Sequence, residues 1–191
     1  MKKLLIRKIL ILFTLTVVIF AVQLNTAANS DFFSNSVNSL VKLQVMRGDE
    51  NGNLNLNNKV TRAEFTTMVV RMLGYDKTVN VDNIKMSFTD ITSKHWAYNY
   101  FKIAVNKGLI TGYTDNTVKP NNNVTFTEAR AILIRALGYG NSMSGSWPNN
   151  VINKSEEIGL NKSLDLPGDK EITREEAAGL IYNSLTINFK K

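Results

Sequence analysis

The sequence predicts an all-α protein: three helix–loop–helix repeats packed as a pseudo-threefold bundle, with short strands possible in the linkers. The first observation behind this prediction is an internal repeat. Residues 31–76 align without a gap on residues 95–140, and 12 of 46 positions are identical. The second is that each copy has a Thr-x-x-Glu capping box followed by apolar residues at helical spacing. One helix pair cannot bury its own apolar stripe, so the copies should share a core.

Three copies are expected, over residues 29–76, 87–140 and 147–187. The first copy is shortened at its N-terminal end. Its second helix begins after Thr61, an N-cap residue, and ends at Gly74, a residue suited to a helix C-terminus. The third copy is degenerate, but its stretch EITREEAAGLIYNSL still matches NVTFTEARAILIRAL of the second copy at an offset of 48.

Residues 1–28 have the order of a secretory signal peptide: a basic start, an uncharged apolar run over residues 9–22, and small residues up to Ala28. Cleavage is expected after Ala28. The alternative is an uncleaved membrane anchor, but a spanning helix needs roughly 20 apolar residues. No second apolar segment of this kind follows, so no membrane association is expected after cleavage.

Charge and cysteine content narrow the function classes. Removal of residues 1–28 leaves 19 Lys and Arg against 16 Asp and Glu, a mild excess that gives no support for nucleic-acid binding. The chain has no cysteine, so the exported protein must be held by its core alone, which fits a bacterium. No motif for a cofactor is present.

The second copy resembles an S-layer homology (SLH) repeat, and the resemblance extends over nearly the whole chain after residue 28. The matching motifs are Phe88-x-Asp90, His95-Trp96-Ala97, the glycines of Gly108 to Gly112, Thr125-x-x-Glu128 and Leu137-Gly138. The T-R-A-E motif of the family is intact in the first copy at residues 61–64. The third copy has T-R-E-E, whereas the second has Phe126 in place of the arginine.

The resemblance implies a function. Such modules usually occur in threes and hold exported proteins on the cell wall of Gram-positive-type bacteria. Their ligand is a secondary cell-wall polysaccharide, often with a pyruvate ketal on its terminal sugar. The arginine of T-R-A-E helps to form the carboxylate site, which implies a ligand-binding role for Arg62 and Arg174. The matching loop glycines, Gly48 and Gly112, are also expected at the site.

The residues themselves support an anion site at Arg62. This arginine lies in the first helical turn, where the helix dipole disfavours a cation. Free backbone N–H groups at that position attract anions, and an added guanidinium makes a bidentate clamp for a carboxylate. Trp96, like Trp147, either stacks on a sugar ring or closes the end of the bundle.

Other functions are less well supported. Degenerate repeats that have lost sugar binding would leave a scaffold for protein–protein interaction at the cell surface, with a partner that the sequence does not identify. An enzyme is disfavoured, because the adjacent acids Glu175 and Glu176 point apart on a helix. A calcium loop around Gly52 fails because Arg47 occupies the first position, which needs a carboxylate, so no metal site is expected.

Overall fold

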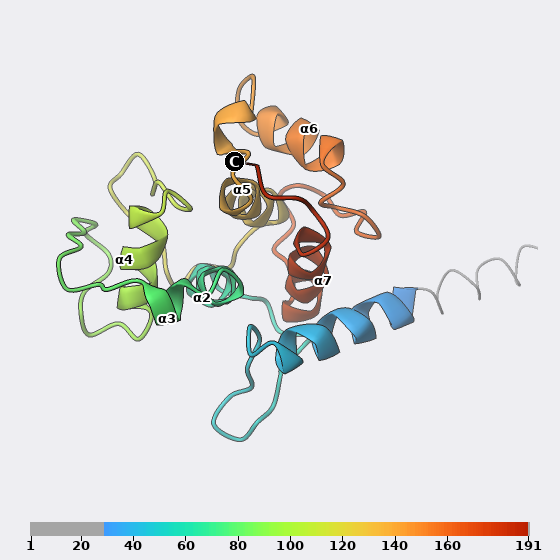
Figure 1. The fold of residues 1–191 in the computed structure, drawn as a ribbon, viewed down its shortest axis with the longest axis horizontal. Coiled ribbons are helices and arrows are strands. Elements are labelled where there is room, and N and C mark those ends of the chain that lie inside the picture. Colours follow the sequence, from blue (N-terminus) through green and yellow to red (C-terminus); the bar gives the residue numbers. More distant parts are fainter. Residues whose placement is uncertain (1–28, 191) are drawn as a thin grey trace, which may run out of the picture.

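The computed structural model describes residues 29–190 (Figure 1). The expected signal peptide lies outside the described residues. The helices are one over residues 29–42, α2 (Arg62–Met72), α3 (Tyr75–Thr78), α4 (Tyr98–Asn106), α5 (Phe126–Ala136), the 3-10 helix η1 (Gly140–Ser142), α6 (Asn149–Glu157) and α7 (Arg174–Ser184). Residues 29–190 contain no β-strand, and the predicted all-α class is confirmed.

The linkers begin with short helices and not with the short strands that the sequence allows. α3 follows α2 directly, and η1 follows α5. Isolated β-bridges occur elsewhere, just before the second helix of each repeat: Lys59 with Thr173, Thr61 with Asn123, and Thr125 with Glu171. These pairings connect different repeats and are too short to form a sheet.

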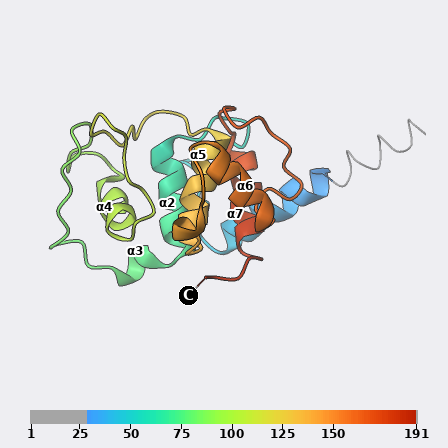
Figure 2. The ribbon, with the colours of Figure 1, turned by 90° about the horizontal axis from the view of Figure 1, so that it is seen from above.

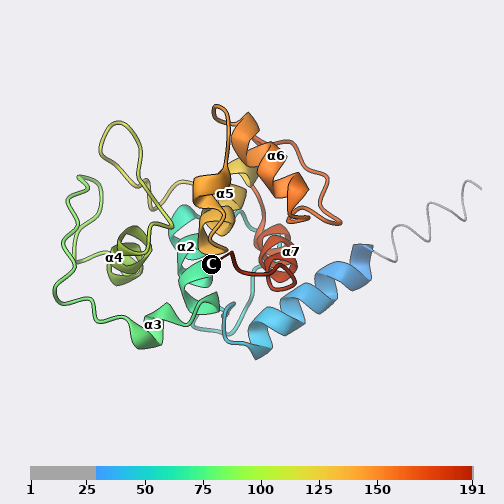
Figure 3. The ribbon, with the colours of Figure 1, turned by 45° about the horizontal axis from the view of Figure 1, so that its top comes forward.

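The second helix of each repeat lies at the centre of the molecule, and the first helix lies outside. Figures 1 and 3 show α2, α5 and α7 surrounded by α4, α6 and the helix over residues 29–42. α4 packs on α2, and α6 packs on α5, so each outer helix rests on the central helix of the preceding repeat. Figure 2 shows the central helices side by side from a second direction.

The same pairing of an outer helix with a central helix joins the first repeat to the last. The helix over residues 29–42 packs on α7, where the rings of Phe32 and Phe33 lie against Gly179. A Cβ added at Gly179 would lie 2.9 Å from Cε1 of Phe32. Phe32 also makes an edge-to-face contact with Tyr182 of α7 at 6.3 Å between ring centroids. The first repeat therefore covers the last one.

A ring of backbone hydrogen bonds marks the pseudo-threefold axis. Val60 N–H donates to Ile172 O at 3.0 Å, Val124 N–H to Val60 O at 3.0 Å, and Ile172 N–H to Val124 O at 3.1 Å. All three side chains are fully buried. Because each residue donates to one neighbour and accepts from the other, the three helix starts are held in a fixed mutual arrangement.

The central helices start alike. Thr61, Thr125 and Thr173 each accept a hydrogen bond from the N3 backbone N–H, and the N3 glutamate bonds back to the cap backbone. This confirms the capping boxes read from the sequence. α6 also forms despite its weak pattern, and its buried Ser155 accepts a hydrogen bond from Arg130 of α5 at 3.1 Å.

Candidate functional site

The helix N-termini are not open to an anion, contrary to the sequence-based expectation. At α2, the N–H of Arg62 donates to Asn122 O at 2.8 Å, and the N–H of Ala63 donates to Pro120 O at 2.9 Å. The N–H of Glu64 donates to the Thr61 hydroxyl. α5 and α7 are capped in the same way by the loops of other repeats. The orphan donors of each helix are thus used for assembly, and any anion site must use side chains.

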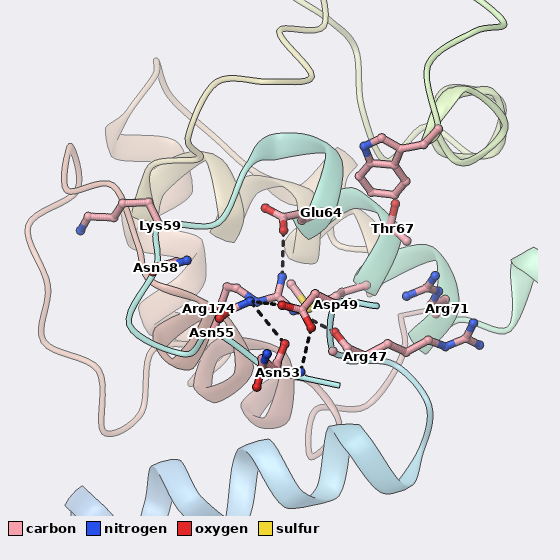
Figure 4. Close-up of a pocket in the computed structure, with 13 residues that line it drawn as sticks. Arg47, Asp49, Asn53, Asn55, Asn58, Lys59, Glu64, Thr67, Arg71 and Arg174 are labelled. Carbon is pink, nitrogen blue, oxygen red and sulfur yellow. Dashed lines mark hydrogen bonds and ion pairs between the residues drawn. The ribbon is translucent and has the colours of Figure 1, made fainter. Parts of the chain in front are cut away.

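Two equivalent grooves lie between the repeats. Groove A, of about 510 Å³, includes Gly48, Glu64, Arg71, Trp96 and Arg174 in its lining (Figure 4). Groove B, of about 410 Å³, includes Gly112, Glu128, Arg135, Trp147 and Arg62. Each member of the second list is the repeat equivalent of the corresponding member of the first.

The five residues predicted to bind the ligand therefore fall into two groups. Arg174, Trp96 and Gly48 come together in groove A. Arg62 and Gly112 come together in groove B. Each groove takes its arginine from the start of one central helix and its loop glycine and N3 glutamate from the following repeat. Both sites therefore depend on the packing of the repeats.

A third groove has the N3 glutamate but neither an arginine nor a tryptophan. Groove C, of about 620 Å³, is lined by Asn161, Ser163, Asp165 and Glu176, with Phe33 of the first described helix. The repeat equivalent of Arg62 is here Phe126, which is only 2% exposed and belongs to the core. None of the residues that line groove C is an arginine.

The two tryptophans do not close the bundle. Trp96 is 58% exposed and Trp147 is 55% exposed, so both rings stand at the edge of a groove. His95 stacks on Trp96 at 5.8 Å between ring centroids, and its Nδ1 accepts the N–H of Ala97. The histidine thus orients the tryptophan and helps to start α4. An exposed aromatic face at a polar groove is a surface suited to stacking.

The loop glycines are required by close packing. A Cβ at Gly48 would lie 2.5 Å from the carbonyl carbon and oxygen of Gly52, so a side chain would force the loop open. Gly112 has φ +75°, and a Cβ there would collide with the ring of Phe88. Both glycines shape their grooves through the backbone.

Arg174 and Arg62 differ in the hydrogen bonds that their guanidinium groups make with the protein. Arg174 is tied to protein: Nε donates to Leu54 O at 2.8 Å, Nη2 to Arg47 O at 3.0 Å, and Nη1 to Glu64 at 3.1 Å. Figure 4 shows the guanidinium of Arg174 facing Glu64. Arg62 is 7% exposed, and within residues 29–190 its side chain makes no hydrogen bond or ion pair. Its guanidinium carbon lies 5.0 Å from the ring centroid of Tyr113.

A second arginine in each groove was missed by the sequence reasoning. Arg71 lines groove A, where Nη2 donates to the Tyr100 hydroxyl at 3.2 Å. Arg135 lines groove B, where burial and then the positive charge of Arg62 lower its pKa. The signal was available, because these two positions are identical in the first two repeats. Groove B therefore presents two neighbouring cations.

The glutamate of groove B is hydrogen-bonded to a tyrosine. The Tyr113 hydroxyl donates a short hydrogen bond to Oε1 of Glu128. Burial, and then this hydrogen bond, raise the pKa of Tyr113 to about 12, against a smaller lowering by the charge of Arg62. The hydroxyl is consequently a proton donor throughout the physiological range.

No helix described over residues 29–190 is long and apolar enough to cross a membrane. Within the same residues, no three His, Asp or Glu side chains are grouped so that they could hold a metal ion.

Comparison with known proteins places the chain in a family. The S-layer homology domain model matches residues 25–66 and 87–129. The "Middle cell wall protein" of Brevibacillus brevis is 32% identical over 153 residues, which is 80% of this chain. The "Surface layer protein" of Brevibacillus choshinensis is 33% identical over 69% of the chain, and the "Cellulosome-anchoring protein" of Acetivibrio thermocellus is 29% identical over 68%.

The fold and the grooves define a module built from internal repeats, with open surfaces where the repeats meet. The chain is an S-layer homology domain protein. It spans only 14% and 12% of the lengths of the two Brevibacillus relatives, and 26% of the cellulosome-anchoring protein.

Proposed function

We propose that this chain attaches to the bacterial cell wall without a covalent bond, by binding an anionic secondary cell-wall polysaccharide in the grooves between its repeats. SLH repeats over residues 29–76, 87–140 and 147–187 form the binding module. The observation that carries the proposal is groove B, where the unpaired guanidinium of Arg62 lies close to Arg135 and an exposed tryptophan. The names of the relatives, which include cell-wall and surface-layer proteins, support a location at the cell surface.

The chemistry of groove B suits a sugar with a carboxylate, such as a pyruvate ketal. Two arginines offer charge-assisted hydrogen bonds to a carboxylate. Trp147 offers a flat apolar face for the ring of the sugar. In groove A, Trp96 and Gly48 form a similar wall. The guanidinium of Arg174 is bonded to backbone carbonyls there, so it shapes the groove more than it offers a charge to a ligand.

The chain is proposed to bind and not to catalyse. Its similarity to S-layer homology modules and to surface-layer proteins favours this role. The grooves combine cations, a tryptophan and an acid that is already hydrogen-bonded, which is an arrangement for holding an anion. Any activity that the attachment serves would reside in a partner or in further chain.

Co-sedimentation with purified cell walls tests the proposed function. The parent protein should sediment with intact walls and remain in the supernatant once the secondary polysaccharide has been extracted. The Arg62→Ala variant should bind the walls more weakly, whereas the matched control Lys77→Ala, which removes an exposed charge on α3, should bind them as the parent does. Binding that survives extraction of the polysaccharide would favour a protein-interaction scaffold instead.

A further inference from the structure

The three N3 glutamates share one contact and differ in another. In each repeat, Oε2 accepts a hydrogen bond from the backbone N–H of the N-cap threonine, at 2.8–3.0 Å. The second oxygen, Oε1, has a different donor in each case: Arg174 for Glu64, Tyr113 for Glu128, and Lys170 for Glu176. One carboxylate position therefore meets a different partner in each groove.

The partner of this oxygen differs between the groove with a paired arginine and the groove with an unpaired one. Arg62 and Glu128 in groove B are the repeat equivalents of Arg174 and Glu64 in groove A. Arg174 forms its ion pair with Glu64 at 3.1 Å. Arg62 and Glu128 line the same groove but do not pair, and Oε1 of Glu128 is bonded to the tyrosine hydroxyl instead.

A hydroxyl at this position is found in the second repeat alone. The repeat equivalents of Tyr113 are Asp49 and Leu164. The carboxylate of Asp49 accepts hydrogen bonds from the loop groups Asn51 N, Asn53 N and Asn55 Nδ2, and it has no proton to donate to Glu64 at neutral pH. A leucine offers no polar group. Without a tyrosine, the glutamates of the other two repeats pair with cations.

The ring of Tyr113 also lies against two cations, of which Arg62 lines groove B. The guanidinium carbon of Arg62 lies 5.0 Å from the ring centroid, and Nζ of Lys119 lies 4.2 Å from it. A cation at these distances is attracted by the ring but keeps its hydrogen-bond donors. Tyr113 therefore fixes Arg62 through its ring and occupies the competing carboxylate through its hydroxyl.

We propose that Tyr113 is a positioning residue that makes groove B the anion-binding groove, by holding Glu128 away from Arg62. Arg62 is thereby left to meet the carboxylate of the wall polymer. In groove A the corresponding arginine is neutralised internally by Glu64. This inference rests on the proposed function and adds a specificity determinant to it.

The Tyr113→Phe variant isolates the hydroxyl, because it keeps the ring. The probe is a methyl hexoside with a pyruvate ketal, compared with the same hexoside without the ketal, in calorimetric titrations. The variant should bind the ketal hexoside about ten- to a hundredfold more weakly, since Glu128 becomes a competitor for Arg62. The plain hexoside should show no such difference.

Rescue separates positioning from a structural effect. Adding Glu128→Gln to Tyr113→Phe removes the competing charge, and the double variant should recover most of the parent's affinity. The single Glu128→Gln variant completes a double-mutant cycle that measures the coupling. A double variant as weak as Tyr113→Phe alone, or an undiminished affinity of Tyr113→Phe, would overturn the proposal.

A crystal structure of the Tyr113→Phe variant gives a readout that needs no ligand. It should show Arg62 paired with Glu128 in the manner of Arg174 and Glu64. If the two side chains stay apart, the proposal is overturned whatever the affinities are. A parent protein that binds neither the ketal hexoside nor cell walls would contradict the proposed function, and the crystal structure would still decide the role of Tyr113.

Discussion

Arg174 and Glu64 are 110 residues apart in the chain, and their side chains form an ion pair of 3.1 Å across two repeats. The same guanidinium also donates to the carbonyls of Leu54 and Arg47. It therefore ties the start of α7 to the loop of the first repeat. The arginine of the T-R-E-E motif thus connects the two ends of the bundle.

The Arg174→Ala variant should be less stable than the parent. The variant loses the hydrogen bonds of a charged group, so its free energy of unfolding should fall by about 1.5–3 kcal/mol. Arg62→Ala removes no hydrogen bond within residues 29–190, so a smaller loss of about 1 kcal/mol is expected from the cation–π contact. Urea denaturation measures both. Equal losses would contradict the distinction between the two arginines.

The titration of Tyr113 should be visible at high pH. Its pKa in the folded protein is about 12, raised from 10 by burial and by the bond to Glu128. The stability that this group contributes is present below about pH 10 and is lost as the pH rises towards 12. Ultraviolet absorbance should show a tyrosine ionisation near pH 12, and that step should be missing from Tyr113→Phe. If the late step persists in the variant, another tyrosine carries the raised pKa.

The tryptophans are built-in reporters, because the chain has two and each lies at a different groove. Added wall polysaccharide should change the fluorescence of Trp147 at lower concentration than that of Trp96, since the arginine of groove B is unpaired. The Trp147→Phe variant should therefore lose the first response, whereas Trp96→Phe should keep it. The reverse order would assign the tighter site to groove A.

The closure of the bundle makes a prediction about Gly179. The Gly179→Val variant forces a side chain against Phe32 and Phe33, and it should destabilise the protein by about 1–3 kcal/mol. Amide hydrogen exchange should then quicken in residues 29–42 and in α7, while α4, which packs on α2, provides the internal reference. Unchanged exchange in residues 29–42 would mean that the two ends of the chain do not depend on each other.

Much of the fold could be predicted from the sequence, because the relevant signals are local. The capping boxes at Thr61, Thr125 and Thr173 lie within four residues of each helix start, and they appear in the structure as expected. The pairing of each outer helix with the preceding repeat could not be predicted. That choice depends on contacts such as Phe33 with Gly179, which lie far apart in the chain.

The candidate site shows the same division. Arg62 could be selected by its position, but the reason given for it did not hold, since the N–H groups of α2 are capped by Asn122 and Pro120 of another repeat. The difference between Arg62 and Arg174 depends on which donor reaches the N3 glutamate. Such a contact brings three segments of the chain together, so it cannot be predicted from helical periodicity or from the spacing of motifs.

The most direct test of the account is a calorimetric titration of Arg62→Ala with the ketal hexoside, beside the parent and the control Lys77→Ala. Loss of the unpaired guanidinium should weaken binding by about 1.5–3 kcal/mol, roughly ten- to a hundredfold, while Lys77→Ala binds as the parent does. Circular dichroism should show all three proteins folded. An Arg62→Ala variant that is folded and binds the ketal hexoside as tightly as the parent would contradict the claim that groove B is the anion site.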